Sequence, residues 1–167
     1  MLKPLVYCVQ NHAARRLHHD FRLEIGVALK GWAITRGPSL VAGEHRLTVA
    51  VEDLALDDGD FEGVIAMGHH GAVLMLLWDR ATGEPDGDCA AALATGSAAL
   101  ILQGEKLIGR WCLERMKSRL CEGHVSWLLV KSHGAAARER SDPDILEEQP
   151  RSVLTGRTVK DIAATAA

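Results

Sequence analysis

Three side chains that can bind a metal ion and a phosphate alternate along one short segment, residues 17–23. With the two-residue period of a β-strand, His18, Asp20 and Arg22 share one face, and mostly apolar side chains occupy the other. Imidazole and carboxylate groups ligate metals, whereas a guanidinium holds a phosphate through two parallel hydrogen bonds. The segment therefore indicates a site where a divalent metal polarises a phosphate ester and an arginine stabilises the developing charge.

A further histidine, His12, lies six residues before His18, and a loop between two strands would bring both rings onto one ion. Two neutral imidazoles and a carboxylate form a donor set that suits Mn²⁺, Zn²⁺ or Fe²⁺ and leaves positions open for substrate and water. A His-x-Asp pair on a strand also occurs as a buried hydrogen-bonded pair or as a coincidence on the surface. The spacing alone leaves these interpretations open.

The composition is that of a soluble globular protein with one domain. The chain has 167 residues, of which 47% are apolar and 25% charged, and its formal net charge is −3. No apolar run approaches the roughly 20 residues that span a bilayer, and the N-terminus lacks the features of a signal peptide.

The cysteines are Cys8, Cys89, Cys112 and Cys121. They form no CxxC pair, so we expect reduced thiols and a cytoplasmic protein.

The charges are distributed unevenly along the chain. Residues 1–36 contain six basic and two acidic side chains, and six acidic side chains follow between residues 52 and 62. A basic segment beside an acidic one fits a site that binds a polyanion together with a metal. A mixed, solvated surface is the alternative that charge alone leaves open.

Short candidate strands, separated by glycine and proline turn signals, dominate the chain. Eight segments fit strands: residues 5–9, 17–23, 29–35, 47–51, 71–78, 98–102, 106–114 and 126–131. Turn signals include residues 83–87, and residues 86–95 are alanine-rich and fit a short helix. Many short strands punctuated in this way are typical of a β-barrel or a β-sandwich.

The character of the sequence changes after His133. Residues 134–150 carry few large apolar side chains, which is typical of a loose linker. Residues 158–162 resemble a capping box that opens a short helix, and such a helix must dock or fray because it is marginal alone. We therefore expect one domain over residues 1–133 and a linker-like tail with a short helix over residues 134–167.

An ordered series of motifs resembles the 3′-phosphoesterase domain of bacterial DNA ligase D. The opening signature is QNHAARRLHHDFRLE at residues 10–24. Further matches follow in the same order at residues 29–33, 36–39, 46–47, 51–53, 60–63, 71–72, 78–80, 104–111 and 127–131. Residues 150–158 resemble the segment that follows this domain in the ligase. The resemblance thus covers nearly the whole chain and is far more specific than any single motif.

The resemblance implies a mainly β fold, a compact, closed or nearly closed barrel of about eight strands with short flanking helices. It implies a manganese-dependent enzyme that trims a 3′-terminal ribonucleotide and removes the resulting 3′-phosphate at primer-template ends. Such an enzyme prepares DNA or DNA/RNA ends for bacterial non-homologous end joining. Ligase, polymerase and end-bridging repair proteins are the partners that this role implies, with no membrane contact.

The resemblance also assigns roles to individual residues. The family's metal ligands fall on His12, His18 and Asp20, its phosphate-contacting arginines on Arg22 and Arg46, its active-site lysine on Arg36, and a further acid on Glu52. Replacement of the lysine by arginine keeps the charge but changes the geometry of the donors.

Two positions depart from the family pattern in a way that bears on catalysis. Leu54 and Asp58 stand where the family has an active-site histidine and tyrosine. Leucine cannot donate a hydrogen bond to phosphate, and an aspartate near a scissile phosphate is unfavourable unless it is protonated, turned away or metal-bound. His69 or His70 is a candidate replacement for the lost imidazole, although a polar turn is an equally simple interpretation of this pair. The chain also begins near its first candidate strand, where the family carries a further N-terminal extension.

Three interpretations of function therefore remain open. The first is a working phosphoesterase with altered activity, and the second is a degenerate homologue that binds metal and DNA ends without turnover. The third is a binding module on which repair partners dock. Loss of metal binding would separate the third from the second. The sequence leaves open whether the chain acts alone or within a longer ligase.

Overall fold

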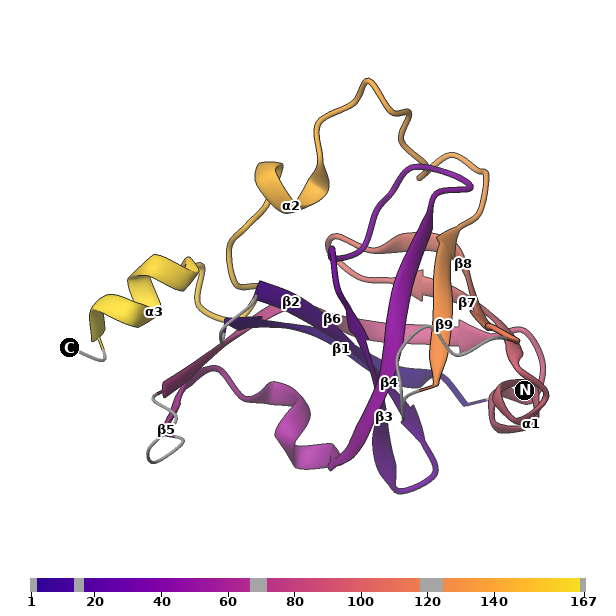
Figure 1. Cartoon of the computed structure of the whole chain (residues 1–167), viewed down its shortest axis with the longest axis horizontal. Helices are drawn as coiled ribbons and strands as arrows, with labels where there is room; N and C mark the ends of the chain where they lie inside the picture. The colour runs from indigo at the N-terminus through magenta and orange to yellow at the C-terminus, as the bar shows by residue number, and fades with distance from the viewer. Residues whose placement is uncertain (1–2, 14–16, 67–71, 118–124, 166–167) are drawn as a thin grey trace.

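Short amphipathic segments pair side by side and curl into a barrel, and the described part of the chain places three short α-helices at its periphery (Figure 1). The computed structural model describes residues 3–13, 17–66, 72–117 and 125–165. The strands are β1 (Leu5–Ala13), β2 (Leu17–Ile25), β3 (Ala28–Ile34), β4 (His45–Ala55), β5 (Gly63–Ala66), β6 (Ala72–Pro85), β7 (Ser97–Gln103), β8 (Ile108–Arg115) and β9 (Ser126–Lys131). The helices are the 3₁₀ helix η1 (Leu56–Asp60), α1 (Cys89–Thr95), α2 (Ile145–Glu148) and α3 (Val159–Thr165).

Eight strands close into a ring in the order β1-β2-β3-β4-β9-β8-β7-β6, and β6 pairs back with β1. β5 pairs with the first residues of β6 outside this ring. All the strand pairs among the described residues are antiparallel. Closure protects the strand edges that would otherwise pair with another chain. The prediction of a mainly β, closed barrel of about eight strands with short helices is confirmed.

Strand alternation separates a packed interior from a polar outer face. On β1 and β2, Tyr7 lies opposite Leu23 and Val9 opposite Phe21, and all four side chains are fully buried in the core. The alternate positions therefore point outward, and this outer face carries the candidate metal ligands. The four tryptophans, Trp32, Trp78, Trp111 and Trp127, are also buried in the barrel core, at 1–6% exposure.

Several elements differ from those expected. β1 continues to Ala13, so His12 lies on a strand and not in a loop. β6 continues to Pro85 through part of the predicted turn, because residues 74–83 pair with β1, residues 72–75 with β5 and residues 83–85 with β7. β5 and η1 were not expected, since short segments without clear alternation give no period to detect.

The helices begin at side-chain caps. Asp88 accepts a hydrogen bond from the Ala91 backbone N–H at 3.1 Å and opens α1, within the segment predicted to be helical. At α3, Thr158 and Asp161 cap each other reciprocally, at 2.8 and 3.2 Å, which confirms the predicted capping box. Among the described residues, no helix is long and apolar enough to cross a membrane.

The segment after residue 133 packs against the barrel. Ile145 and Ile162 are 2% and 1% exposed and belong to the same core cluster as the barrel interior. The indole N–H of Trp78 donates to the Gln149 carbonyl at 2.8 Å, and the Val153 N–H donates to the Leu77 carbonyl at 2.9 Å. The tail is therefore docked. Division of the chain into two units at residue 133 stays a prediction.

A buried polar network holds the loop between β7 and β8. The Asp79 carboxylate accepts hydrogen bonds from the Tyr7 hydroxyl at 3.1 Å and from the Leu107 N–H at 2.9 Å. Gly104 lies against this network: a Cβ there would overlap the Tyr7 hydroxyl and the Asp79 carboxylate. The close approach of loop and network therefore requires a glycine at this position.

We expect Gly104→Ala to lower the free energy of unfolding by about 2–3 kcal/mol, the usual cost of overpacking a rigid interior. Urea denaturation measures this change. Tyr7→Phe removes the hydroxyl that the new methyl group meets, so the double variant should lose less stability than the sum of the two single variants. A Gly104→Ala protein as stable as the wild type would contradict the packing described here.

Candidate metal centre

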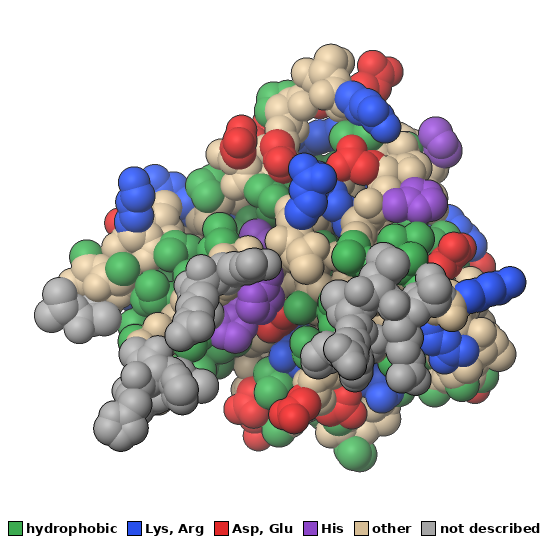
Figure 2. Space-filling view, viewed as in Figure 1, with side chains coloured by type: hydrophobic (Ala, Val, Ile, Leu, Met, Phe, Trp, Pro, Cys, Tyr) green, Lys and Arg blue, Asp and Glu red, His purple; other side chains and the backbone are tan. Residues whose placement is uncertain are grey.

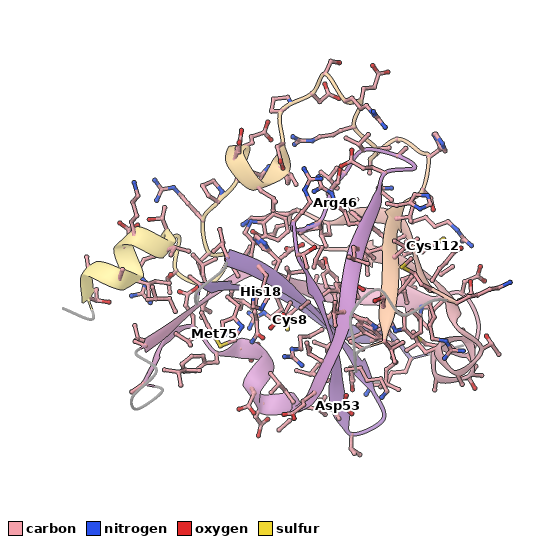
Figure 3. All side chains as sticks on the ribbon, viewed as in Figure 1. Cys8, His18, Arg46, Asp53, Met75 and Cys112 are labelled. Carbon is pink, nitrogen blue, oxygen red and sulfur yellow. The ribbon has the colours of Figure 1, made fainter. Side chains whose placement is uncertain are left out.

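Two neighbouring strands bring the three candidate ligands together. In the β1–β2 register, His12 lies opposite His18, and Asp20 is two residues further along β2 on the same outer face. Nδ1 of His12 is 3.5 Å and Nε2 of His18 is 3.2 Å from the Asp20 carboxylate. Figure 3 labels His18 on β2, and Figure 2 shows histidine side chains reaching the surface near the middle of this view.

The group fits a divalent metal ion. The ligand atoms of His12, His18 and Asp20 all lie within 4.8 Å of one another, and no other such group of His, Cys, Asp or Glu occurs among the described residues. Nδ1 of His12 and Oδ1 of Asp20 are buried without a hydrogen-bond partner in the described structure. An unsatisfied buried polar atom costs about 1–3 kcal/mol, and a cation would satisfy both. The donor set is one that binds Mn²⁺, Zn²⁺ or Fe²⁺.

Asp20 is held in the form that ligates metals. Burial by itself raises the pKa of this carboxyl, but the His12 and His18 rings, 3.5 and 3.2 Å from it, favour the anion and lower the pKa. Together with the charge of Arg22, these rings keep the pKa of Asp20 well below its usual range. Asp20 is therefore an anion at neutral pH, as a carboxylate ligand must be.

Arg22 is anchored beside this group. Its side chain is 7% exposed, and Nη2 lies 3.6 Å from the Asp20 carboxylate. Nη1 donates to the backbone carbonyl of Glu52 at 2.7 Å, whereas the Glu52 side chain is exposed. Nε of Arg22 is buried without a partner among the described residues. The structure thus brings Arg22 to the three candidate ligands, and the main chain of Glu52 holds it there.

A bulge in β4 places Leu54 on the same face. Gly31 pairs with Val51 and Leu29 with Leu54, so β4 has one residue more than β3 between these pairs. Gly31 also lies opposite Arg22, and opposed residues share a face. Leu54 is therefore on the face of the candidate metal ligands, where it offers only an apolar side chain.

Asp58 lies in η1, next to the same face. Its backbone carbonyl accepts a hydrogen bond from Nε2 of Gln10 at 3.1 Å, and its side chain is exposed. Gln10 is opposite Asp20 in the sheet, fully buried, and leaves Oε1 without a partner in the described structure. Gln10 was not predicted to be a site residue, although the two-residue period of β1 places it on the same face as His12.

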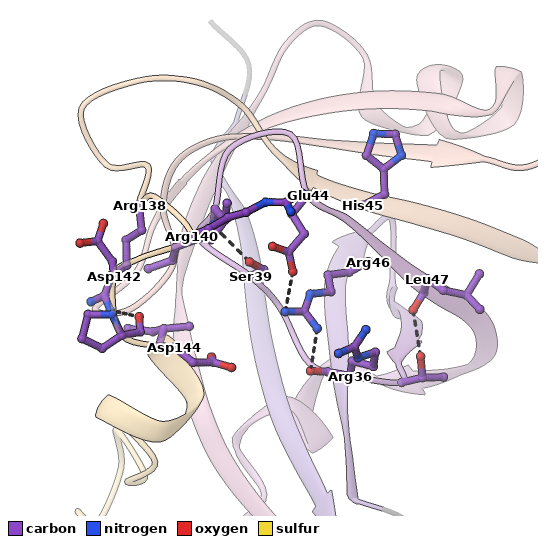
Figure 4. Close-up of a pocket in the computed structure, with 15 residues that line it drawn as sticks. Arg36, Ser39, Glu44, His45, Arg46, Leu47, Arg138, Arg140, Asp142 and Asp144 are labelled. Carbon is purple, nitrogen blue, oxygen red and sulfur yellow. Dashed lines mark hydrogen bonds and ion pairs between the residues drawn. The ribbon is translucent and has the colours of Figure 1, made fainter.

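Arg36 and Arg46 line a separate pocket at one end of the barrel, with a volume of about 570 Å³ (Figure 4). Nη2 of Arg46 pairs with the Glu44 carboxylate at 2.8 Å, and Nη1 donates to the Arg36 carbonyl at 3.4 Å. The residues that line this pocket do not include His12, His18 or Asp20. Figure 3 shows Arg46 near the start of β4, away from His18 in this view.

Three further histidines were considered from the sequence, and one of them lies in the core. His19 is 5% exposed and packs edge-on against Trp78 at 5.5 Å, as a core residue. Burial lowers the pKa of this ring to about 4, so it is neutral at physiological pH. His69 and His70, the candidate replacements for the lost imidazole, lie outside the described residues.

Comparison with known proteins identifies relatives of this sequence. The model of the DNA ligase D 3′-phosphoesterase domain matches residues 10–115. The multifunctional non-homologous end joining protein LigD of Pseudomonas aeruginosa is 46% identical over 155 residues, which cover 93% of this chain and 18% of that protein. The multifunctional non-homologous end joining DNA repair protein LigD of Mycobacterium tuberculosis is 33% identical over 109 residues, which cover 65% of this chain and 14% of that protein. The chain thus spans less than a fifth of the length of these curated relatives.

Proposed function

This chain belongs to the DNA ligase D 3′-phosphoesterase family, and from that premise we propose that it is a metal-dependent phosphoesterase of nucleic acid 3′ ends. The single observation that carries the proposal is the cluster of His12, His18 and Asp20 with Arg22 against it. The metal proposed for this cluster is manganese. The reactions proposed are release of a 3′-terminal ribonucleoside, removal of a 3′-phosphate, or both.

The residues of the cluster divide into two tasks in this proposal. His12, His18 and Asp20 would hold the divalent metal, whose chemistry at such a site is polarisation of the phosphoryl oxygens. Arg22 holds negative charge beside them, because its guanidinium is oriented by Asp20 and by the Glu52 carbonyl and keeps Nε free of other partners in the described structure. Arg36 and Arg46, to which the resemblance assigns further phosphate contacts, line a separate pocket in which Arg46 is paired with Glu44.

The biological setting follows from the relatives. Their names place them in non-homologous end joining, and we propose the same pathway for this chain. Its substrates would be DNA or DNA/RNA 3′ ends at primer-templates, and its partners the ligase, polymerase and end-bridging proteins that act on the same breaks.

A second candidate function rests on Leu54 and Asp58. At positions where the family has a histidine and a tyrosine, these residues offer no group that donates a proton or a hydrogen bond to a leaving oxygen at neutral pH. A homologue that binds metal and DNA ends without turnover is therefore the alternative to an active enzyme.

A gel assay separates these functions. The substrates are two primer-templates, one with a single 3′-terminal ribonucleotide and one with a 3′-phosphate, each incubated with Mn²⁺ or with EDTA. Shortening or dephosphorylation that requires Mn²⁺ supports the enzyme. A folded protein that binds Mn²⁺ and DNA ends but leaves both substrates intact supports the alternative, and absence of metal binding would contradict both.

We expect Leu54→His to raise Mn²⁺-dependent turnover about tenfold. A general acid raises the rate at least about a hundredfold in a site built around it. An imidazole added to a site that lacks the supporting residues should give only part of this rate enhancement. Leu56→His is the matched control, because Leu56 is an exposed leucine in the adjacent η1. Equal rates for the wild type and both variants would show that the missing imidazole does not limit this chain.

A further inference from the structure

One aromatic side chain differs from all the others in its exposure. The chain has four tryptophans, two phenylalanines and one tyrosine, and all of them lie within the described residues. Six of these side chains are buried, at 0–6% exposure, whereas Phe61 is 39% exposed. Phe61 follows η1 and precedes β5. Aromatic surface is therefore offered to a ligand at this one place in the described structure.

The sheet register places the Phe61 ring on the face of the candidate metal ligands. Met75 on β6 lies opposite His12 of β1 on one side and opposite Gly63 of β5 on the other. Opposed residues share a face, so all three are on the outer face of the barrel. A Cβ added to Gly63 would lie 3.6 Å from Cζ of Phe61, so the ring lies over Gly63 on that face. Figure 3 labels Met75 and His18 close together in this view.

Apolar side chains extend from the ring along this outer face. Met75 is 8% exposed and Leu77 is fully buried, although neither belongs to the core cluster inside the barrel. Leu77 is two residues from Met75 on β6, and the two-residue period puts both on the outer face. By the same period Ile65, two residues after Gly63, is on this face, and it is 38% exposed. The Phe61 ring thus belongs to an apolar surface that begins beside the candidate metal ligands.

The backbone on both sides of Phe61 is fixed. Its own N–H donates to the Asp58 carbonyl at 3.3 Å. The side chain of Glu62, 1% exposed, accepts the Leu77 N–H at 2.9 Å and pairs with Arg157 at 3.4 Å. A ring on a fixed backbone loses little conformational freedom when a flat ligand packs against it. The exposed part of the ring is therefore preorganised for such a contact.

We propose that a base of the substrate stacks on Phe61 while the reacting phosphate lies at the metal cluster. Aromatic rings stack any base, because every base has a π-face. Gly63, under the ring, is two strands from His12, or about 10 Å, which one nucleotide can span. The base therefore belongs to a nucleoside joined to the reacting phosphate, either the 3′-terminal one or the one before it. This inference rests on the proposed function, because it assumes that a 3′ end occupies the metal centre.

The test is a double-mutant cycle between the ring and the base, with Kd measured by fluorescence anisotropy in EDTA, which prevents turnover. Three primer-templates end in a single 3′-ribonucleotide: one is complete, one lacks the terminal base and one lacks the penultimate base. Phe61→Leu keeps an apolar side chain over Gly63 but removes the π-face. It should weaken binding of the complete primer-template about fivefold, the low end for one stacked base. Where the contacted base is missing, Phe61→Leu and the wild type should bind equally.

Two variants control for folding and for loss of exposed apolar surface. Phe61→Trp should bind the complete primer-template at least as tightly as the wild type, since it keeps an aromatic face. Ile108→Ala removes an exposed apolar side chain at the start of β8 and should bind all three ligands as the wild type does. Titration calorimetry should give the same Mn²⁺ affinity for Phe61→Leu and the wild type. A lower Mn²⁺ affinity would assign the ring a structural role and overturn the inference.

The ligand on which the Phe61→Leu deficit disappears identifies the stacked base as terminal or penultimate. A deficit of equal size on all three ligands would show that the ring contacts no base at the 3′ end, and it would overturn the inference. Equal binding of the complete primer-template by Phe61→Leu and the wild type would also overturn it and leave the proposed function intact. A wild-type protein that fails to bind the complete primer-template would overturn both.

Discussion

Replacing Asp20 by asparagine is expected to abolish Mn²⁺ binding and to reduce turnover of 3′-end substrates about a thousandfold. The amide keeps the shape of the side chain but lacks the charge, which the His12 and His18 rings and Arg22 stabilise in the native site. A thousandfold corresponds to the several kcal/mol of charge stabilisation that a metal supplies to a phosphoryl group. Titration calorimetry with Mn²⁺ and the gel assay measure the two effects.

Asp57→Asn provides the matched control for this experiment. Asp57 is an exposed carboxylate at the start of η1, so its loss changes the net charge of the same region without touching the cluster. Circular dichroism establishes that Asp20→Asn is folded. A folded Asp20→Asn protein that still binds Mn²⁺ with wild-type affinity would refute the assignment of the metal centre.

Replacing Gly31 by alanine is expected to reduce turnover about a hundredfold while leaving Mn²⁺ binding intact. A Cβ at this position would lie 2.7 Å from Cζ of Arg22 and 2.8 Å from Cγ2 of Val51, and it would overlap Nη1 of Arg22. The guanidinium must then leave the Glu52 carbonyl, and with it the position beside Asp20. Loss of one preorganised donor to a developing charge costs about a hundredfold or more.

Arg22→Lys tests whether the effect of Gly31→Ala passes through Arg22. Lysine keeps the charge but loses the planar fork of donors, so we expect a similar deficit from this variant. The double variant should be little worse than either single one, because both remove the same interaction. Additive losses would show that Gly31→Ala acts on another part of the site.

The two-residue period of the sequence was sufficient to predict which side chains of β2 share the face of the candidate site. Between residues 17 and 23 the side chains alternate, so burial of Phe21 and Leu23 forces His18, Asp20 and Arg22 onto the opposite face whatever the partners of the strand are. Local turn chemistry likewise separated most strands correctly, and the reciprocal cap of Thr158 and Asp161 was predictable because it lies within one turn of helix.

Only the tertiary structure decided which residues of other strands lie beside that face. His12 reaches His18 because β1 pairs with β2 in one register, and Arg22 is held by a carbonyl inside a β4 bulge thirty residues away. The tail looked like a linker because its apolar residues are sparse, yet Ile145 and Ile162 each fill a place in the core, and Arg138 and Arg140 complete a pocket. Contacts of this kind join segments far apart in sequence, and periodicity within a segment carries no information about its distant partners.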